Sequence, residues 1–238
     1  MTMIACLSIL GTSCQSASRP VDVRIDALVS IDGKLKLATA CWQLKVSDTF
    51  PQGAVIDVKG TALIIPVTSR LNIYGLFRTL QGNELVDWSI VPAVLNAFVR
   101  EEDYQSGRTK WAPTSPGKFI DYAVNRLSGR RVPLCQPVTE RSRLNSTCPA
   151  LIYFRDISDP NTAVRITPGR LFKLNGHTAV IKSITATYDI SPHKRKDNNI
   201  LLPKFVDVKV NETYAPFPDS SNIQDGMFLK TDDFWRDQ

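Results

Sequence analysis

The sequence predicts an α+β fold that is mainly β, with antiparallel strands and hairpins arranged as a sandwich or a twisted sheet, and with two helices. Three observations support this prediction. Apolar and polar residues alternate through residues 21–31, as in a half-buried strand. The tight-turn dipeptides Asp32-Gly33 and Asn175-Gly176 separate apolar runs. Fifteen prolines against twelve glycines favour loops and sheet edges over long helices.

The first hairpin has the clearest pattern. Residues 21–31 form its first strand, and Asp32-Gly33 turns the chain so that it returns through Leu35 and Leu37. The apolar positions then change parity, because Trp42 falls on the opposite phase. We therefore expect a bulge or bend near residues 38–40.

Further elements follow in order along the chain. Short strands are predicted at 54–58 and 61–67, the second ending or lying at an edge at Pro66, because proline cannot donate to a strand ladder. Residues 70–80 fit either a strand or a helical turn. Apolar residues at helical spacing predict one helix after Ser89, within 87–104, and a second over 115–129.

The C-terminal half returns to strands, predicted at 150–157, 162–166, 170–175, 178–190 and 204–210. We expect the remainder, 211–238, to be an irregular tail in which Phe228, Phe234 and Trp235 are candidate docking anchors. The predicted organisation is a candidate leader at 1–13, a tether at 14–20, one β-rich domain at 21–210 and the tail. A division near residues 110–115 is the alternative.

The first thirteen residues are uncharged and mostly apolar, and they match a signal-peptide apolar core in length. A basic leader, which signal peptides usually have, does not precede them. The segment resembles a bacterial lipoprotein signal with Cys14 as the lipid-attachment residue after Ser13, although Gly11 stands where that pattern usually has Leu. The resemblance implies a membrane-tethered protein of the cell envelope, and Gln15 after the cysteine implies the outer membrane. Export without lipid and a cytosolic protein are the alternatives.

A second resemblance rests on "VDVRIDALVSIDGK", "GAVIDVKGTALIIPVTSRLNIYGLFRTL" and "CPALIYFRDISDPNTAVRITPGRLFKLNGHTAVIKSITATYDIS". These stretches are similar to a β-rich bacterial protein family without an assigned activity. The resemblance implies a bacterial origin and a single β-rich domain, and it carries over no site.

The cysteines also favour export. Cys135 and Cys148 bound a polar, proline-containing loop and are predicted to form a disulfide. A zinc site would need four ligands, and the chain has only two histidines, so no metal is expected. Cys41 is predicted to be a buried thiol in a strand.

Motifs for catalysis and for nucleotide or cofactor binding are absent from the sequence, so no catalytic residue and no cofactor is assigned. His177 is predicted at a turn or strand edge, and His193 in a solvated basic loop. The strongest candidate for binding is cationic, because guanidinium groups suit carboxylate and phosphate oxygens. Its candidate anion-binding residues are Arg126, Arg130 and Arg131 at a predicted helix C-terminus, and Arg141 and Arg143 in the disulfide loop.

The net charge of +6 is spread along the chain, which favours anionic surfaces over nucleic acid. The predicted function is a lipid-anchored, non-enzymatic binding module that contacts an anionic envelope polymer or a protein partner. A secreted or periplasmic hydrolase with an unrecognised site is the alternative, and a cytosolic partner-binding domain is the second.

Overall fold

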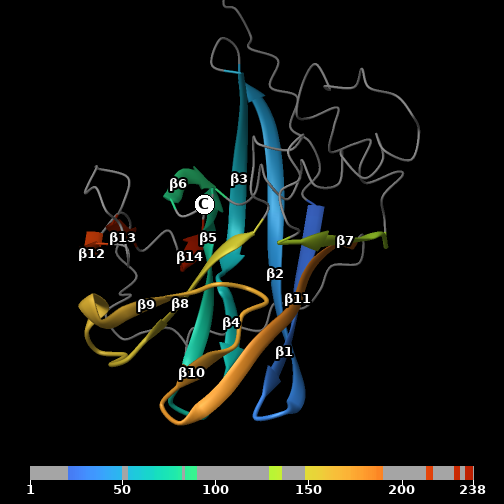
Figure 1. Cartoon of the computed structure of the whole chain (residues 1–238). Helices are drawn as coiled ribbons and strands as arrows, with labels where there is room; N and C mark the ends of the chain where they lie inside the picture. Colours follow the sequence, from blue (N-terminus) through green and yellow to red (C-terminus); the bar gives the residue numbers. More distant parts are fainter. Residues whose placement is uncertain are drawn as a thin grey trace, which may run out of the picture.

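A computed structural model shows a mainly β protein built from antiparallel strands (Figure 1). The residues that the structure describes are 21–49, 53–81, 84–89, 129–135, 148–189, 213–216, 228–230 and 234–237.

Among these residues, seven strands form the larger sheet. They are β1 (Val21–Ile31), β2 (Lys34–Thr49), β3 (Gly53–Thr61), β7 (Arg131–Leu134), β10 (Phe172–Leu174), β11 (His177–Asp189) and β14 (Trp235–Asp237). Their spatial order is β10-β11-β1-β2-β3-β14, and β7 also pairs with β11. The long strand β1 therefore lies between β2 and β11, with which it shares its whole length.

Five described strands form the smaller sheet, and two more form a short ribbon. The smaller sheet contains β4 (Leu63–Pro66), β5 (Asn72–Gln81), β6 (Glu84–Ser89), β8 (Pro149–Phe154) and β9 (Ala163–Ile166). Its order is β4-β5-β8-β9, with β6 beside β5. The ribbon pairs β12 (Thr213–Pro216) with β13 (Phe228–Lys230). A 3-10 turn, Pro160–Thr162, connects β8 to β9.

The two larger sheets pack face to face around the main core. On β1 every second residue is fully buried, from Val23 to Val29, which is the period-two pattern expected of a half-buried strand. Trp42 of β2 packs on Phe77 of β5 with ring centroids 4.9 Å apart, and its indole Nε1 donates to the carbonyl of Thr61. The chain passes from one sheet to the other at the buried residue Ala62, between β3 and β4.

The smaller sheet is buried on its second face as well. There Tyr74 and Phe154 pack with Phe234, which comes from the C-terminal segment. Burial raises the pKa of Tyr74 to about 12, although Asn72, whose side-chain amide donates to the phenol oxygen, acts in the opposite direction. This second core consists of Ile64, Tyr74, Leu76, Ala150, Ile152, Phe154, Leu229 and Phe234.

Several predictions are confirmed. Asp32-Gly33 and Asn175-Gly176 form the turns of the β1–β2 and β10–β11 hairpins, each with two positive φ angles. β4 lies at an edge of its sheet and ends at Pro66. Residues 72–81, for which two structures were open, form strand β5.

The predicted change of parity along β2 is confirmed, but the bulge or bend expected near residues 38–40 is absent. Leu35 and Leu37 point away from the core, each 65% exposed, and the β1–β2 register runs without a bulge. The core positions of β2 begin at Ala38 and keep one parity to Leu44. The bulge lies instead in β11, where Lys182 interrupts the register with β1.

The two predicted helices lie almost wholly outside the described residues, as does the strand predicted at 204–210. Ser89, the predicted N-cap of the first helix, is the last residue of strand β6. The tail predicted to be irregular contributes three short strands. Its residues Leu229 and Phe234 pack on the face of the smaller sheet that points away from the main core. Phe234 is therefore the anchor that the sequence suggested.

The predicted disulfide between Cys135 and Cys148 is present, with Cα atoms 4.1 Å apart. Cys135 directly follows β7 of the larger sheet, and Cys148 directly precedes β8 of the smaller sheet. The bond thus joins the two layers covalently. Cys41 lies in β2 as predicted, but it is half-buried rather than buried.

Candidate functional site

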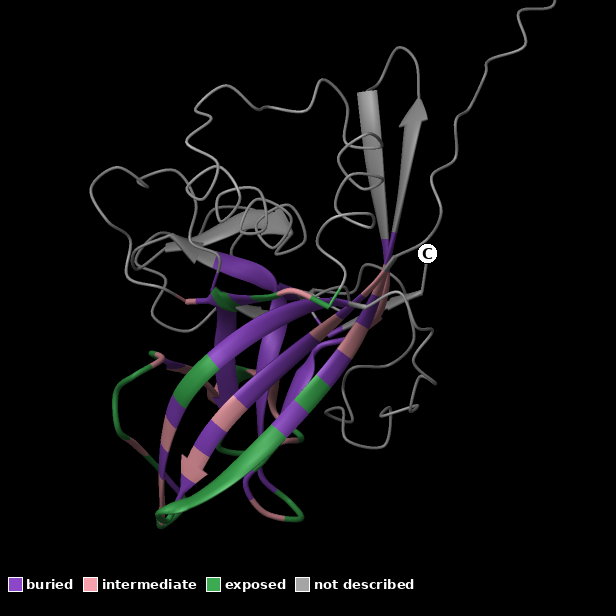
Figure 2. Ribbon diagram, turned by 90° about the vertical axis from the view of Figure 1, so that its right-hand side faces the viewer, coloured by how far each residue is buried: buried purple, intermediate pink, exposed green. Residues whose placement is uncertain are grey.

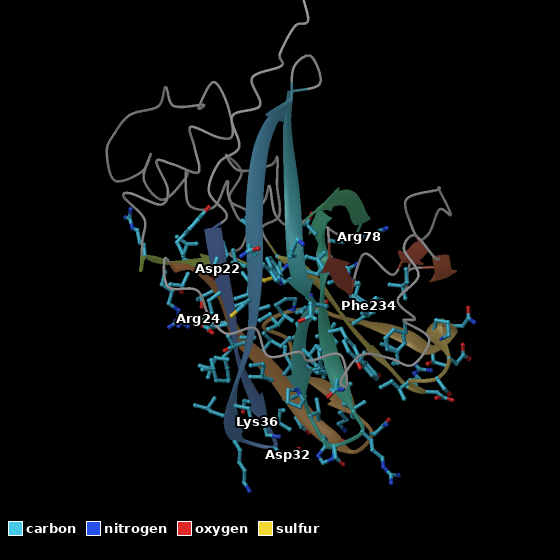
Figure 3. The ribbon with its side chains drawn as sticks, turned by 180° about the vertical axis from the view of Figure 1, so that it is seen from behind. Asp22, Arg24, Asp32, Lys36, Arg78 and Phe234 are labelled. Atoms are coloured by element: carbon cyan, nitrogen blue, oxygen red, sulfur yellow. A yellow bond between two sulfur atoms is a disulfide. The ribbon has the colours of Figure 1, made fainter. Side chains whose placement is uncertain are left out.

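The face of the larger sheet that points away from the main core carries the polar residues of β1. We call it the outer face; on β1 it consists of the even-numbered residues from Asp22 to Ser30. Figure 3 shows Asp22 and Arg24 toward one end of β1, and Asp32 and Lys36 at the hairpin tip. Although this face is polar, three of its residues are almost completely buried: Asp26, Thr185 and Thr187.

Two arginines form hydrogen bonds with these buried side chains. Arg24 Nε lies 3.1 Å from Asp26 Oδ2, and Thr39 donates to the other carboxylate oxygen of Asp26 over 2.8 Å. Arg131 Nε, from β7, donates to the hydroxyl of Thr185 over 2.8 Å. Arg24 is therefore paired with a carboxylate, whereas Arg131 donates to an uncharged hydroxyl.

Arg24, Thr187 and Arg131 form one row across three neighbouring strands. In the register, Thr187 of β11 lies opposite Arg24 of β1 on one side and opposite Arg131 of β7 on the other. The Thr187 hydroxyl is buried and has no hydrogen-bond partner among the described residues. Buried hydroxyls are normally paired, so this row combines two guanidinium groups with an unused donor. We call these three residues the arginine row.

Only part of the predicted cationic cluster lies in the described residues. Arg131 belongs to the row and is exposed, and Arg130 is half-buried beside it. Both follow Gly129, which has a positive φ angle and whose N–H donates to the carbonyl of Tyr188, and Arg131 begins β7. The helix predicted to end before them lies outside the described residues. The other predicted residues, Arg126, Arg141, Arg143 and the lipid-attachment residue Cys14, lie outside the described residues, as does His193.

His177 begins strand β11, as predicted, and contacts Asp32 across the two hairpin tips. The imidazole Nδ1 lies 2.7 Å from Asp32 Oδ2, while Thr178 N–H donates to Oδ1 over 2.8 Å. These two contacts lower the pKa of Asp32 below its usual value, the bond to His177 contributing most. The Asp32 N–H also donates to the Thr178 carbonyl, so the pair fastens one hairpin tip to the other.

The described residues contain no cluster of three or more His, Cys, Asp or Glu side chains that could hold a metal ion. In the same residues no helix is long and apolar enough to span a bilayer.

Sequence reasoning missed Arg24 and Thr187. Arg24 is one polar residue in an alternating strand, and nothing local to it indicates Arg131, which is more than a hundred residues away. The sequence could have shown that Arg24 and Thr187 occupy polar positions of predicted strands. Only the structure shows that β11 pairs with both β1 and β7.

Comparison with protein-family models, with curated proteins and with solved structures finds no match to this chain.

Proposed function

We propose that the protein is a non-enzymatic binding module of a bacterial cell envelope that is tethered through Cys14 and binds the acidic groups of an anionic envelope polymer at the arginine row. The observation that supports the proposal most is the row itself, in which Arg24 and Arg131 flank Thr187, whose buried hydroxyl has no hydrogen-bond partner in the described part of the chain. Guanidinium groups present several N–H donors in a plane and bind phosphate or carboxylate oxygens in pairs.

The charge distribution favours an anion over a neutral ligand. Arg131 is exposed and donates to Thr185, and no carboxylate of the described residues pairs with it, so an incoming anion would meet an exposed guanidinium. Arg24 is half-exposed and shares Asp26 with Thr39, which leaves further guanidinium N–H groups for a ligand.

The position of the row agrees with a tether at residues 14–20. Arg24 is three residues from Val21, where β1 begins, so the row lies at the end of the sheet that the tether reaches first. A polymer close to the membrane would therefore meet this end of the domain.

The binding experiment titrates the protein with poly(glycerol phosphate) by isothermal calorimetry, with uncharged dextran in parallel. We expect Arg131→Gln to weaken binding about tenfold or more, because a charge-assisted pair of hydrogen bonds is lost. The matched control is Arg155→Gln, which removes one positive charge from an exposed loop beside the smaller sheet. Equal affinity of wild type and Arg131→Gln would contradict the proposal.

The tether is tested separately, by growing a bacterial host that expresses the chain in the presence of labelled palmitate. We expect label in the wild-type protein and none in Cys14→Ala, since the modified atom is the thiol sulfur. Cys41→Ala should incorporate label like wild type. Unlabelled wild-type protein, or equal labelling of Cys14→Ala, would refute the anchor.

A further inference from the structure

The three large apolar residues that are most exposed in the described part of the chain lie at the hairpin-tip end of the larger sheet, two on β2 and one directly before β10. Leu35 and Leu37 are each 65% exposed, and Leu171 is 63% exposed. Leu35 and Leu37 lie on β2 beside the hairpin turn, where residues 32–37 form a continuous exposed stretch (Figure 2). Leu171 immediately precedes β10, which is separated from β2 by the strands β11 and β1.

The strand register joins these residues into a band. Ser30 lies opposite Leu35 on one side and Val180 on the other, and Leu28 lies opposite Leu37. Continuing the β10–β11 register by one residue places Leu171 opposite Val180. Phe172 packs toward the main core, so the alternation of an extended chain directs Leu171 to the outer face.

The apolar band therefore crosses four adjacent strands, β10, β11, β1 and β2. At the usual strand separation this corresponds to a width of about 14 Å. It consists of Leu28, Leu35, Leu37, Leu171 and Val180.

Cations border the band. Arg170 directly precedes Leu171, and Lys173 follows it by two residues. Lys182, at the bulge of β11, is exposed and adjoins Ser183, which lies opposite Leu28. Two described carboxylates lie near the band. Asp32 is held by His177 and Thr178, and Asp26, two residues from Leu28, is buried and held by Arg24 and Thr39. Apolar side chains surrounded by lysine and arginine are the composition of surfaces that lie on anionic bilayers.

We infer that the apolar band is a docking surface for an anionic phospholipid bilayer, into whose interface the exposed leucines insert. The inference rests on the proposed location at a membrane. It goes beyond the proposed function because the band makes a second contact with the bilayer, at the end of β1 opposite to the tether. The band lies toward the hairpin tip and the arginine row toward the start of β1, so the two proposed contacts use different ends of the outer face.

The test measures flotation of the full chain carrying Cys14→Ala with vesicles of phosphatidylglycerol and with vesicles of phosphatidylcholine. In this unlipidated chain we expect binding to phosphatidylglycerol that weakens as salt is raised, because salt screens the lysine and arginine charges. Adding Leu35→Ser and Leu37→Ser should reduce the bound fraction about tenfold or more at limiting lipid, since both side chains lose most of their apolar area. The matched control, Leu35→Ile with Leu37→Ile, keeps that area and should bind like its parent.

Each outcome decides the inference. Equal flotation of the serine and isoleucine variants would overturn it, and so would a parent chain that does not float with phosphatidylglycerol. If sedimentation shows that the parent self-associates and the serine variant is monomeric, the band is an interface between copies and the inference is wrong. Labelling at Cys14 and binding of poly(glycerol phosphate) are measured independently, so failure of the proposed function is distinguishable from failure of the band.

Discussion

Replacing Phe234 with alanine is expected to lower the free energy of unfolding by about 3–5 kcal/mol, the usual cost of deleting a buried phenyl ring from a core. The ring is fully buried and lies 5.8 Å from Tyr74 and 6.2 Å from Phe154, measured between centroids. Its loss would leave a cavity in the second core, on the face of the smaller sheet that points away from the main core. The backbone carbonyl of Phe234, which accepts from the Ala62 N–H over 2.7 Å, would remain.

Urea unfolding followed by tryptophan fluorescence measures this loss. Phe172→Ala is the matched control, because that ring is only partly buried at the edge of the main core. It should cost clearly less than Phe234→Ala. A loss below about 1 kcal/mol for Phe234→Ala would show that the C-terminal segment does not complete the second core.

The second large effect concerns the disulfide. The double variant Cys135→Ala and Cys148→Ala should be less stable than wild type by about 3 kcal/mol, because the cross-link limits the conformations of the unfolded chain. The two cysteines are 13 positions apart in the sequence, and the bond connects the end of β7 in one sheet to the start of β8 in the other. Loss of the bond therefore also frees the edge strand β7, which carries Arg131.

Thermal unfolding with and without reductant provides the measurement. Reductant should lower the Tm of the wild type and leave the double variant unchanged. Cys41→Ala, which keeps the disulfide, should respond to reductant like the wild type. A double variant whose Tm still falls on reduction would mean that another thiol pair is responsible.

Local chemistry explains why the hairpins were predictable. A two-residue turn with two positive φ angles suits only a few dipeptides, and Asp-Gly and Asn-Gly are among them. Asp32-Gly33 and Asn175-Gly176 adopt this geometry. The alternation of β1 was equally informative, because one of its faces is buried from Val23 to Ile31.

The exposure of Leu35 and Leu37 could not be predicted, because the sequence alone does not distinguish an exposed leucine from a buried one. The nearest neighbours of Leu35 and Leu37 are Ser30 and Leu28 on the outer face, and the core side is filled instead from Ala38 onward. The bulge at Lys182 had the same difficulty. Its position depends on the register in which β11 pairs with β1, and β1 lies more than a hundred residues earlier in the chain.

The candidate site was predicted in part. Its charge type and one member, Arg131, followed from the cationic cluster, but the cluster was assigned to a helix end that the described residues do not include. Arg24 and Thr187 join Arg131 only through strand pairing, which is a non-local property. A strand pattern gives the face on which a residue lies but not its neighbours across the sheet.

The burial of the smaller sheet on both faces has a consequence for synthesis. A ribosome delivers β8 some eighty residues before Phe234, so the apolar face of the nascent sheet lacks this ring during that interval. Final closure of the domain must wait for the arrival of this aromatic ring. Chaperones that hold emerging chains would find their target there.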